Sequence, residues 1–141
     1  MGHLMDRTDT PPIHQQVTWV YTQDLDTTTP FYEQILGLPL ILDQGTCRIY
    51  RSSATSFLGV CRTRPGREVE PRGLVLTLVT PDVDLWYARL RAAGVQVLAA
   101  PQHSAQFNVY SFFALDPNGY RIEFQRFLDP AWPVATQAAD D

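Results

Sequence analysis

The same order of segments occurs twice in this chain, and an internal repeat of this kind narrows the possible folds more than any other feature. Gln16–Thr22, rich in β-branched and aromatic residues, predicts a strand, and a helical pattern follows it and ends at Gly37. The second copy begins near residue 74, and Asp82 stands fifty-eight positions after Asp24. Its helical pattern ends at Gly94. The chain is therefore predicted to contain one strand–helix unit twice.

Three strand-like runs follow the helix in each copy, at residues 38–42, 47–51 and 56–62, and at residues 95–99, 109–115 and 120–126. The last two are joined by Asp116-Pro117-Asn118-Gly119, a sequence typical of a tight turn. Asp26 and Thr27 are expected to cap the first helix. The pattern predicts an α+β fold of two βαβββ modules, residues 16–62 and 74–126, joined by a Pro/Gly-containing linker at 63–73. The two modules are predicted to form a single domain over residues 13–127. A flexible tail at 1–12 precedes it, and a flexible acidic tail at 128–141 follows it.

Three motifs in register on this doubled pattern resemble the vicinal oxygen chelate superfamily, which contains glyoxalases, bleomycin resistance proteins and extradiol dioxygenases. They are Asp24-Leu25 with Phe31-Tyr32-Glu33-Gln34-Ile35-Leu36-Gly37-Leu38, Asp82-Val83-Asp84 with Ala93-Gly94-Val95, and Asp116-Pro117-Asn118-Gly119-Tyr120-Arg121-Ile122-Glu123-Phe124. The resemblance implies a half-open, barrel-like sheet with helices outside and a ligand cleft on the concave face. It also implies a homodimer.

Metal-dependent members of that family draw ligands from the first strand of each module and from module-terminal strands. The resemblance places Glu123 at one ligand position, but Val17 and Val75 at the other two. A register shift of one residue would replace Val17 by Gln16. Valine has no donor atom, so we expect no metal and no other cofactor. The alternative is a divalent metal held by His14, His103 and Glu123.

Strand alternation predicts which side chains share the cleft with Glu123. In the last strand Arg121 and Gln125 lie on its side. On the strand before it, either Tyr110 with Phe112 or Ser111 with Phe113 faces the cleft, and we favour the first pair. His103 is expected in a loop at 101–107. The predicted ligand-binding residues are Trp19, Tyr21, Thr77, Val79, Tyr110, Phe112, Arg121, Gln125 and His103.

An aromatic cleft with few polar groups suits a small apolar or aromatic ligand. The leading hypothesis is a metal-independent binding protein resembling the bleomycin resistance branch. The first alternative is a purely structural role, in which these aromatic residues only close the core of a small barrel. The other alternative is an enzyme, a lyase, isomerase or dioxygenase, in which Glu123 is a metal ligand with non-standard partners or a metal-free general base.

Composition excludes several function classes. All 11 basic residues are arginine, so mechanisms that need a lysine are absent. The net charge of −4 argues against nucleic-acid partners, and no apolar run approaches the length of a membrane span. We therefore expect a cytoplasmic protein. We predict that Cys47 and Cys61 are buried free thiols. We also predict that the arginines at 62, 64, 67 and 72 belong to a solvent-exposed linker and form no binding site.

Overall fold

The computed structural model describes residues 9–134, and these form the two predicted βαβββ modules. The first comprises β1 (Gln16–Thr22), α1 (Leu25–Pro30), a π-helical turn η2 (Phe31–Ile35), β2 (Leu40–Asp43), β3 (Cys47–Ser53) and β4 (Ser56–Arg62). The second comprises β5 (Val75–Val79), α2 (Val83–Ala92), β6 (Gln102–Ser104), β7 (Val109–Leu115) and β8 (Arg121–Phe127). The α+β class and the order of elements are confirmed.

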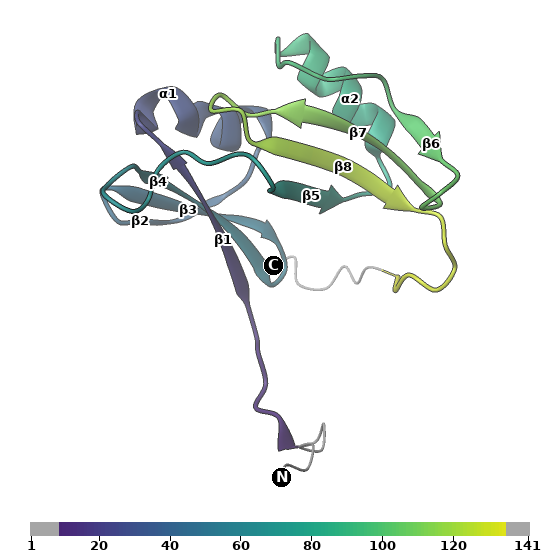
Figure 1. The fold of residues 1–141 in the computed structure, drawn as a ribbon, viewed down its shortest axis with the longest axis horizontal. Coiled ribbons are helices and arrows are strands. Elements are labelled where there is room, and N and C mark those ends of the chain that lie inside the picture. Colours follow the sequence, from purple (N-terminus) through teal and green to yellow (C-terminus); the bar gives the residue numbers. More distant parts are fainter. Residues whose placement is uncertain (1–8, 135–141) are drawn as a thin grey trace.

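Each module forms its own four-stranded mixed sheet within the described residues. The strand orders are β1-β4-β3-β2 and β5-β8-β7-β6. β1 pairs in parallel with β4, and β5 pairs in parallel with β8, while the other pairs are antiparallel. Figure 1 shows α1 and α2 on the same side of the molecule, each with its own module. Across residues 9–134 the sheets stay open, and neither closes into a barrel.

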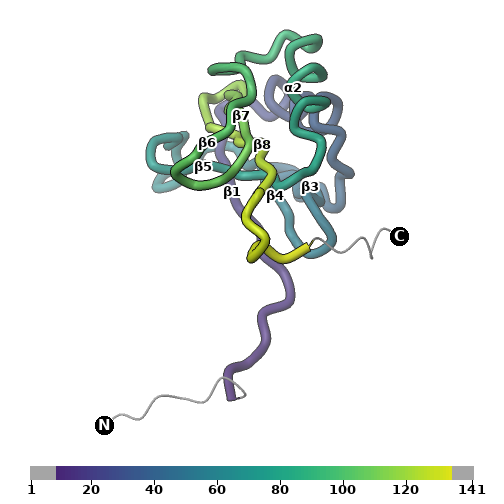
Figure 2. Tube along the Cα trace, turned by 90° about the vertical axis from the view of Figure 1, so that its right-hand side faces the viewer, coloured from purple at the N-terminus to yellow at the C-terminus, as the bar shows by residue number. Residues whose placement is uncertain are grey.

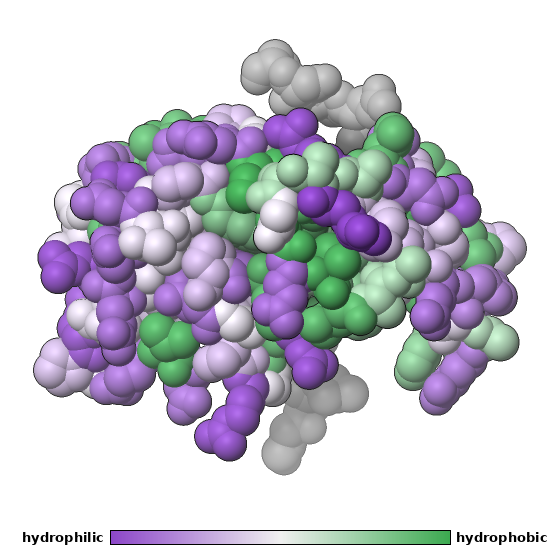
Figure 3. All heavy atoms as spheres, turned by 90° about the horizontal axis from the view of Figure 1, so that it is seen from above, coloured by the Kyte–Doolittle hydropathy of each residue, from purple (hydrophilic) through white to green (hydrophobic). Residues whose placement is uncertain are grey.

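The core lies between the helices and the helix-facing side of each sheet. In the second module Trp86 of α2 stacks on Phe124 with ring centroids 5.0 Å apart, and Phe124 stacks on Phe112 at 5.2 Å. In the first, the fully buried Tyr32 and Tyr50 stack at 6.1 Å. Seen from above Figure 1, apolar side chains gather between two more polar flanks (Figure 3). The alternation of side chains in each strand thus leaves a second face, turned away from the helices, which we call the open face.

The predicted turn before β8 ties the two modules together. Asp116 accepts hydrogen bonds through Oδ1 from the backbone N–H groups of Asn118 (2.8 Å) and Tyr120 (2.9 Å). Its Oδ2 accepts one from the Tyr32 hydroxyl of the first module at 2.6 Å. Burial raises the pKa of Asp116, and the hydrogen bond from Tyr32 acts in the opposite direction. The Tyr120 hydroxyl in turn accepts from the backbone N–H of Tyr21, so the packing of the modules rests on buried polar groups.

Three local predictions are wrong. Asp24, and not Asp26 or Thr27, caps α1, because its carboxylate accepts from the Asp26 N–H at 3.0 Å. Residues 95–99 form only a single bridge, Val97 with Ala114, rather than a strand. The second strand of this module is instead β6, inside the predicted loop at 101–107. Pro101 explains the shift, since it has no N–H for pairing and the strand resumes after it.

The segments outside the two modules are only partly described. Residues 1–8 and 135–141 of the predicted tails lie outside the described range, so their flexibility stays a prediction. Residues 9–15 are exposed and leave the body of the domain as an extended arm in both the ribbon and the tube view (Figures 1 and 2). After β8, Trp132 stacks on Phe127 with centroids 3.7 Å apart. None of the helical elements in residues 9–134 has the length and apolar character needed to cross a membrane.

Candidate functional site

Trp19 lies flat against the backbone of β4 on the open face of the first sheet. The β1–β4 register places it beside Gly59, and the indole occupies the space that a Cβ at Gly59 would need. Any side chain at position 59 would therefore displace the ring. Trp19 nevertheless keeps 38% of its surface exposed. One face of the indole is fixed on the strand while the other is available to a ligand.

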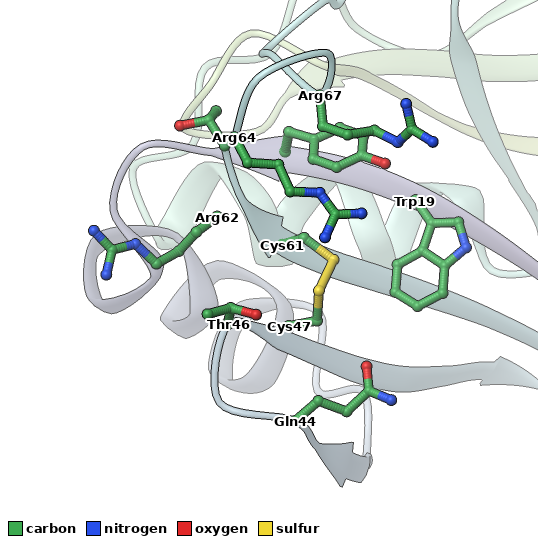
Figure 4. Close-up of a pocket in the computed structure, with 10 residues that line it drawn as sticks. Trp19, Gln44, Thr46, Cys47, Cys61, Arg62, Arg64 and Arg67 are labelled. Atoms are coloured by element: carbon green, nitrogen blue, oxygen red, sulfur yellow. A yellow bond between two sulfur atoms is a disulfide. The ribbon is translucent and has the colours of Figure 1, made fainter.

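A pocket of about 710 Å³ opens beside this indole (Figure 4). Trp19 and Tyr21 come from β1, and further residues come from the start of β3, the end of β4 and the linker that follows. The volume lies within the range of small-molecule sites. The lining residues are Trp19, Tyr21, Gln44, Thr46, Cys47, Cys61, Arg62, Thr63, Arg64 and Arg67.

Cys47 and Cys61 form a disulfide in the wall of this pocket, so the prediction of two free thiols is wrong. They are direct partners in the antiparallel β3–β4 pair, which brings their Cα atoms to 4.0 Å. The sequence spacing did not indicate the pairing, because a fourteen-residue separation fits many arrangements. Disulfides form in oxidising compartments and are rare in the cytosol, so this bond counts against the cytoplasmic expectation. The compartment itself stays a prediction.

Three arginines that the sequence interpretation assigned to a solvated linker lie at one end of the pocket. Figure 4 shows the guanidinium of Arg64 turned toward the disulfide and Trp19, while the Arg67 side chain extends above Trp19 in this view. Arg62 points away from the indole, and its charge contributes to a lowered pKa of Asp24, for which the hydrogen bond from Thr27 is the larger cause. Arg72 does not line this pocket. The pocket therefore combines an aromatic wall with a cationic rim.

Glu123 lies on the open face of the second sheet, as predicted. It is 9% exposed, and both carboxylate oxygens accept hydrogen bonds, Oε1 from the Thr77 hydroxyl at 2.8 Å and Oε2 from the Gln125 amide at 2.7 Å. The register of β5 with β8 confirms that Thr77 and Val79 share the face of Glu123 and Gln125. Arg121 on the same strand lines a separate pocket of about 570 Å³ near the linker. Glu123 is not among the residues that line the Trp19 pocket.

Within the described part of a single chain, the side chains around Glu123 do not make up a set of metal ligands. Val17 and Val75 lie on the open faces, where the family resemblance places ligands, and they offer no donor atom. Gln16 has the opposite parity to Val17 and lines a different pocket, with Thr18. Within residues 9–134, no three His, Cys, Asp or Glu side chains gather closely enough to hold a metal ion. The alternative set of His14, His103 and Glu123 is therefore not assembled.

Three of the predicted ligand-binding residues face the helix side of the second sheet, which corrects their assignment to the cleft. Phe112 packs between Phe124 and Tyr87 of α2, and the Tyr110 hydroxyl donates to Asp84 of α2 at 2.6 Å. His103 is the β6 partner of Tyr110 and shares its face. The pair not favoured, Ser111 and Phe113, faces the open side instead, because Phe113 is the β7 partner of Glu123.

Comparison with known proteins assigns the family. Residues 13–124 match the model of the glyoxalase/bleomycin resistance protein/dioxygenase superfamily. The chain belongs to this superfamily, as its motifs indicated. No match was found among curated proteins.

Crystal structures with similar folds include three members or relatives of this superfamily. A glyoxalase/bleomycin resistance protein/dioxygenase from Nocardioides has a TM-score of 0.68 and 22% identity over 92% of this chain and 93% of its own. Lactoylglutathione lyase from Agrobacterium tumefaciens has a TM-score of 0.67 and 21% identity over 83% of this chain and 96% of its own. A glyoxalase-related enzyme from Fulvimarina pelagi has a TM-score of 0.70 and 21% identity over 86% of this chain and 91% of its own. At these identities the likeness shows the fold alone.

The superfamily fold accounts for the open faces, and the side chains of this chain set the composition of the Trp19 pocket. Its aromatic wall, Trp19 and Tyr21, was predicted from strand alternation. Its cationic rim was missed, although a signal was present: Arg64-Pro65-Gly66-Arg67 is a typical tight-turn sequence that holds its first and last residues together.

Proposed function

We propose that this superfamily member is a binding protein for a small aromatic molecule, which it holds in the Trp19 pocket without a metal ion. One observation carries the proposal: the indole is pressed onto Gly59, where no side chain intervenes, and its other face borders a pocket of about 710 Å³. A ring fixed in this way loses little conformational freedom on binding, and preorganisation of this kind favours affinity.

The pocket supplies the contacts that a flat ligand needs. Offset stacking on an indole contributes about 0.5–1.5 kcal/mol beyond the area buried. Tyr21 adds a second aromatic surface, and the disulfide adds a rigid apolar one. Gln44 and Thr46 place hydrogen-bonding groups at the margin. Six of the ten lining residues are polar or charged, so the pocket offers hydrogen-bonding partners as well as aromatic surface.

Catalysis by Glu123 is the second candidate. One observation favours it: a carboxylate 9% exposed is held by two neutral donors, with no cation paired to it in the described part of the chain. Two observations favour binding instead. Both oxygens of Glu123 are already hydrogen-bonded, and the side chain does not line the Trp19 pocket.

The experiment is a thermal-shift screen against planar aromatic compounds, followed by calorimetric titration of the hits. We expect hits whose affinity falls about tenfold or more in Trp19→Ala, since a stacked aromatic contact and its buried area are lost. Trp132→Ala is the matched control, because Trp132 is a half-exposed tryptophan that stacks on Phe127 outside the pocket. Equal affinity of Trp19→Ala and the unaltered protein contradicts the proposal. A loss of binding in Glu123→Gln but not in Trp19→Ala would place the ligand beside Glu123 and also contradict the proposal.

The homodimer implied by the family is part of this proposal. Val75 and Val79 on the open face of the second sheet keep 45% and 50% of their surface exposed, which a second copy of the chain would cover. Sedimentation equilibrium should therefore give the mass of two 16.0 kDa chains, and the mass of a single chain would contradict the dimer.

A further inference from the structure

Arg64 and Arg67 are held side by side by the tight turn that leads out of β4. The backbone N–H of Arg64 donates to the carbonyl of Arg67 at 3.1 Å, and the N–H of Arg67 donates to the carbonyl of Arg64 at 2.8 Å. Pro65 and Gly66, with φ +81° at the glycine, occupy the two central positions of the turn. This is the sequence and geometry of a type II turn. Residues paired across such a bridge point their side chains to the same face.

The positive charge of this pair is not balanced by neighbouring carboxylates. Like charges that face one another across a bridge disfavour the fold. Both ion pairs formed by residues 9–134 belong to Arg48. The Glu68 carboxylate accepts from the backbone N–H of Gly66 rather than pairing with a guanidinium, and no acidic residue lines the Trp19 pocket. The turn thus holds the two backbones together, and neither guanidinium is paired with a carboxylate of the described chain; Arg67 donates to the Gly66 carbonyl at 3.0 Å.

The position of the pair indicates what it would bind. Arg64 and Arg67 line the same pocket as Trp19, and Figure 4 shows the Arg64 guanidinium directed toward the indole and the disulfide. A ligand whose ring lies on Trp19 would therefore carry its substituent to the arginine rim. Guanidinium groups bind carboxylate, phosphate and sulfonate oxygens through paired hydrogen bonds.

We propose that the ligand of this pocket is an aromatic oxyanion, whose ring stacks on Trp19 and whose negatively charged group is bound by Arg64 and Arg67. This inference rests on the proposed function and adds the charge of the ligand to it. It also gives the arginine pair a role, because a bound anion removes the repulsion between the two guanidinium groups. Neutral aromatics of the same shape are expected to bind more weakly.

The test compares 2-naphthoate with 2-naphthamide, which share a ring system and differ in charge. Calorimetric titration of the full chain should show tighter binding of the acid by at least about tenfold, as expected for hydrogen bonds between charged groups. Raising the salt concentration should weaken binding of the acid and leave binding of the amide nearly unchanged. Naphthalene-2-sulfonate and 2-naphthyl phosphate, measured in parallel, identify which oxyanion geometry is preferred.

The double variant Arg64→Gln/Arg67→Gln should lose the preference for the acid while its affinity for the amide stays the same. The unchanged affinity for the amide shows that the pocket is still folded. Arg72→Gln is the matched control, because Arg72 belongs to the same linker but does not line the Trp19 pocket. Equal binding of acid and amide by the unaltered protein overturns this inference and leaves the proposed function standing. Failure of both compounds to bind overturns both proposals.

Discussion

The hydrogen bond between Tyr32 and Asp116 should be among the polar contacts that stabilise the folded domain most. Tyr32→Phe removes the hydroxyl that lies 2.6 Å from Asp116 Oδ2, while both residues are almost fully buried, at 0% and 4% exposed. Oδ1 keeps its two backbone donors, but Oδ2 is left without a partner away from water. A buried hydrogen bond to a charged group contributes about 1.5–3 kcal/mol. Urea unfolding at neutral pH should show a loss of about 2 kcal/mol.

The size of this loss should depend on pH. Burial raises the pKa of Asp116 in the folded protein above its ordinary value of 3.8, and loss of the Tyr32 donor raises this pKa further. For an acid whose folded pKa lies above its unfolded pKa, stability is greatest below the unfolded pKa and decreases as the pH rises through the folded one. The loss caused by Tyr32→Phe should therefore be largest at neutral pH and shrink as the pH falls toward 3.8.

Tyr50→Phe is the matched control for this measurement. Tyr50 is also 0% exposed and donates to a carboxylate, Glu33 Oε2, at 2.7 Å. The Glu33 side chain, however, is 35% exposed and lies 3.7 Å from Arg48, so water and the guanidinium can replace the lost donor. We expect its loss of stability to be less than half that of Tyr32→Phe. Equal losses in the two variants, or a loss in Tyr32→Phe that is independent of pH, would refute the reasoning.

Three further predictions concern the pocket. Gly59→Ala should abolish binding of aromatic ligands with only a small change in melting temperature, because the half-exposed Trp19 can move off the strand; unchanged affinity in titration would contradict this. Cys61→Ser should lower the free energy of unfolding in urea by about 3 kcal/mol, since the Cys47–Cys61 bond closes a loop of about fifteen residues. The unaltered protein with this disulfide reduced should show the same stability as the variant. His103→Ala should bind aromatic ligands like the unaltered protein, because His103 faces the helix side; a tenfold loss would refute this placement.

The modules were predictable because local signals and the repeat agreed. The glycines that end both helical patterns, the alternation in β1 and β5 and the turn at 116–119 all pointed to the same arrangement. Strand parity alone also predicted that Trp19, Thr77 and Gln125 lie on the open faces. Such inferences succeed where one strand's own sequence sets the direction of its side chains.

Errors arose where a position depends on pairing between strands. The turn sets Leu115 opposite Arg121, and this register, rather than the sequence of β7 alone, turns Phe112 toward α2. The disulfide likewise follows from the β3–β4 register, which makes Cys47 and Cys61 direct partners. The arginine rim was missed for another reason: its charges alternate with Glu68 along the chain, which suggested ion pairs, whereas the Glu68 carboxylate accepts from the backbone N–H of Gly66 instead of pairing with a guanidinium.

The central claim is that an aromatic ligand binds against the open face of Trp19. The most direct measurement is a titration of ¹⁵N-labelled protein with 2-naphthoate, observed at the indole N–H signals and assigned with Trp19→Phe. The account predicts a saturable shift of the Trp19 signal, while Trp86, stacked on Phe124 in the core, and Trp132, stacked on Phe127, stay in place. A Trp19 signal that does not move while the ligand saturates the protein would contradict the account.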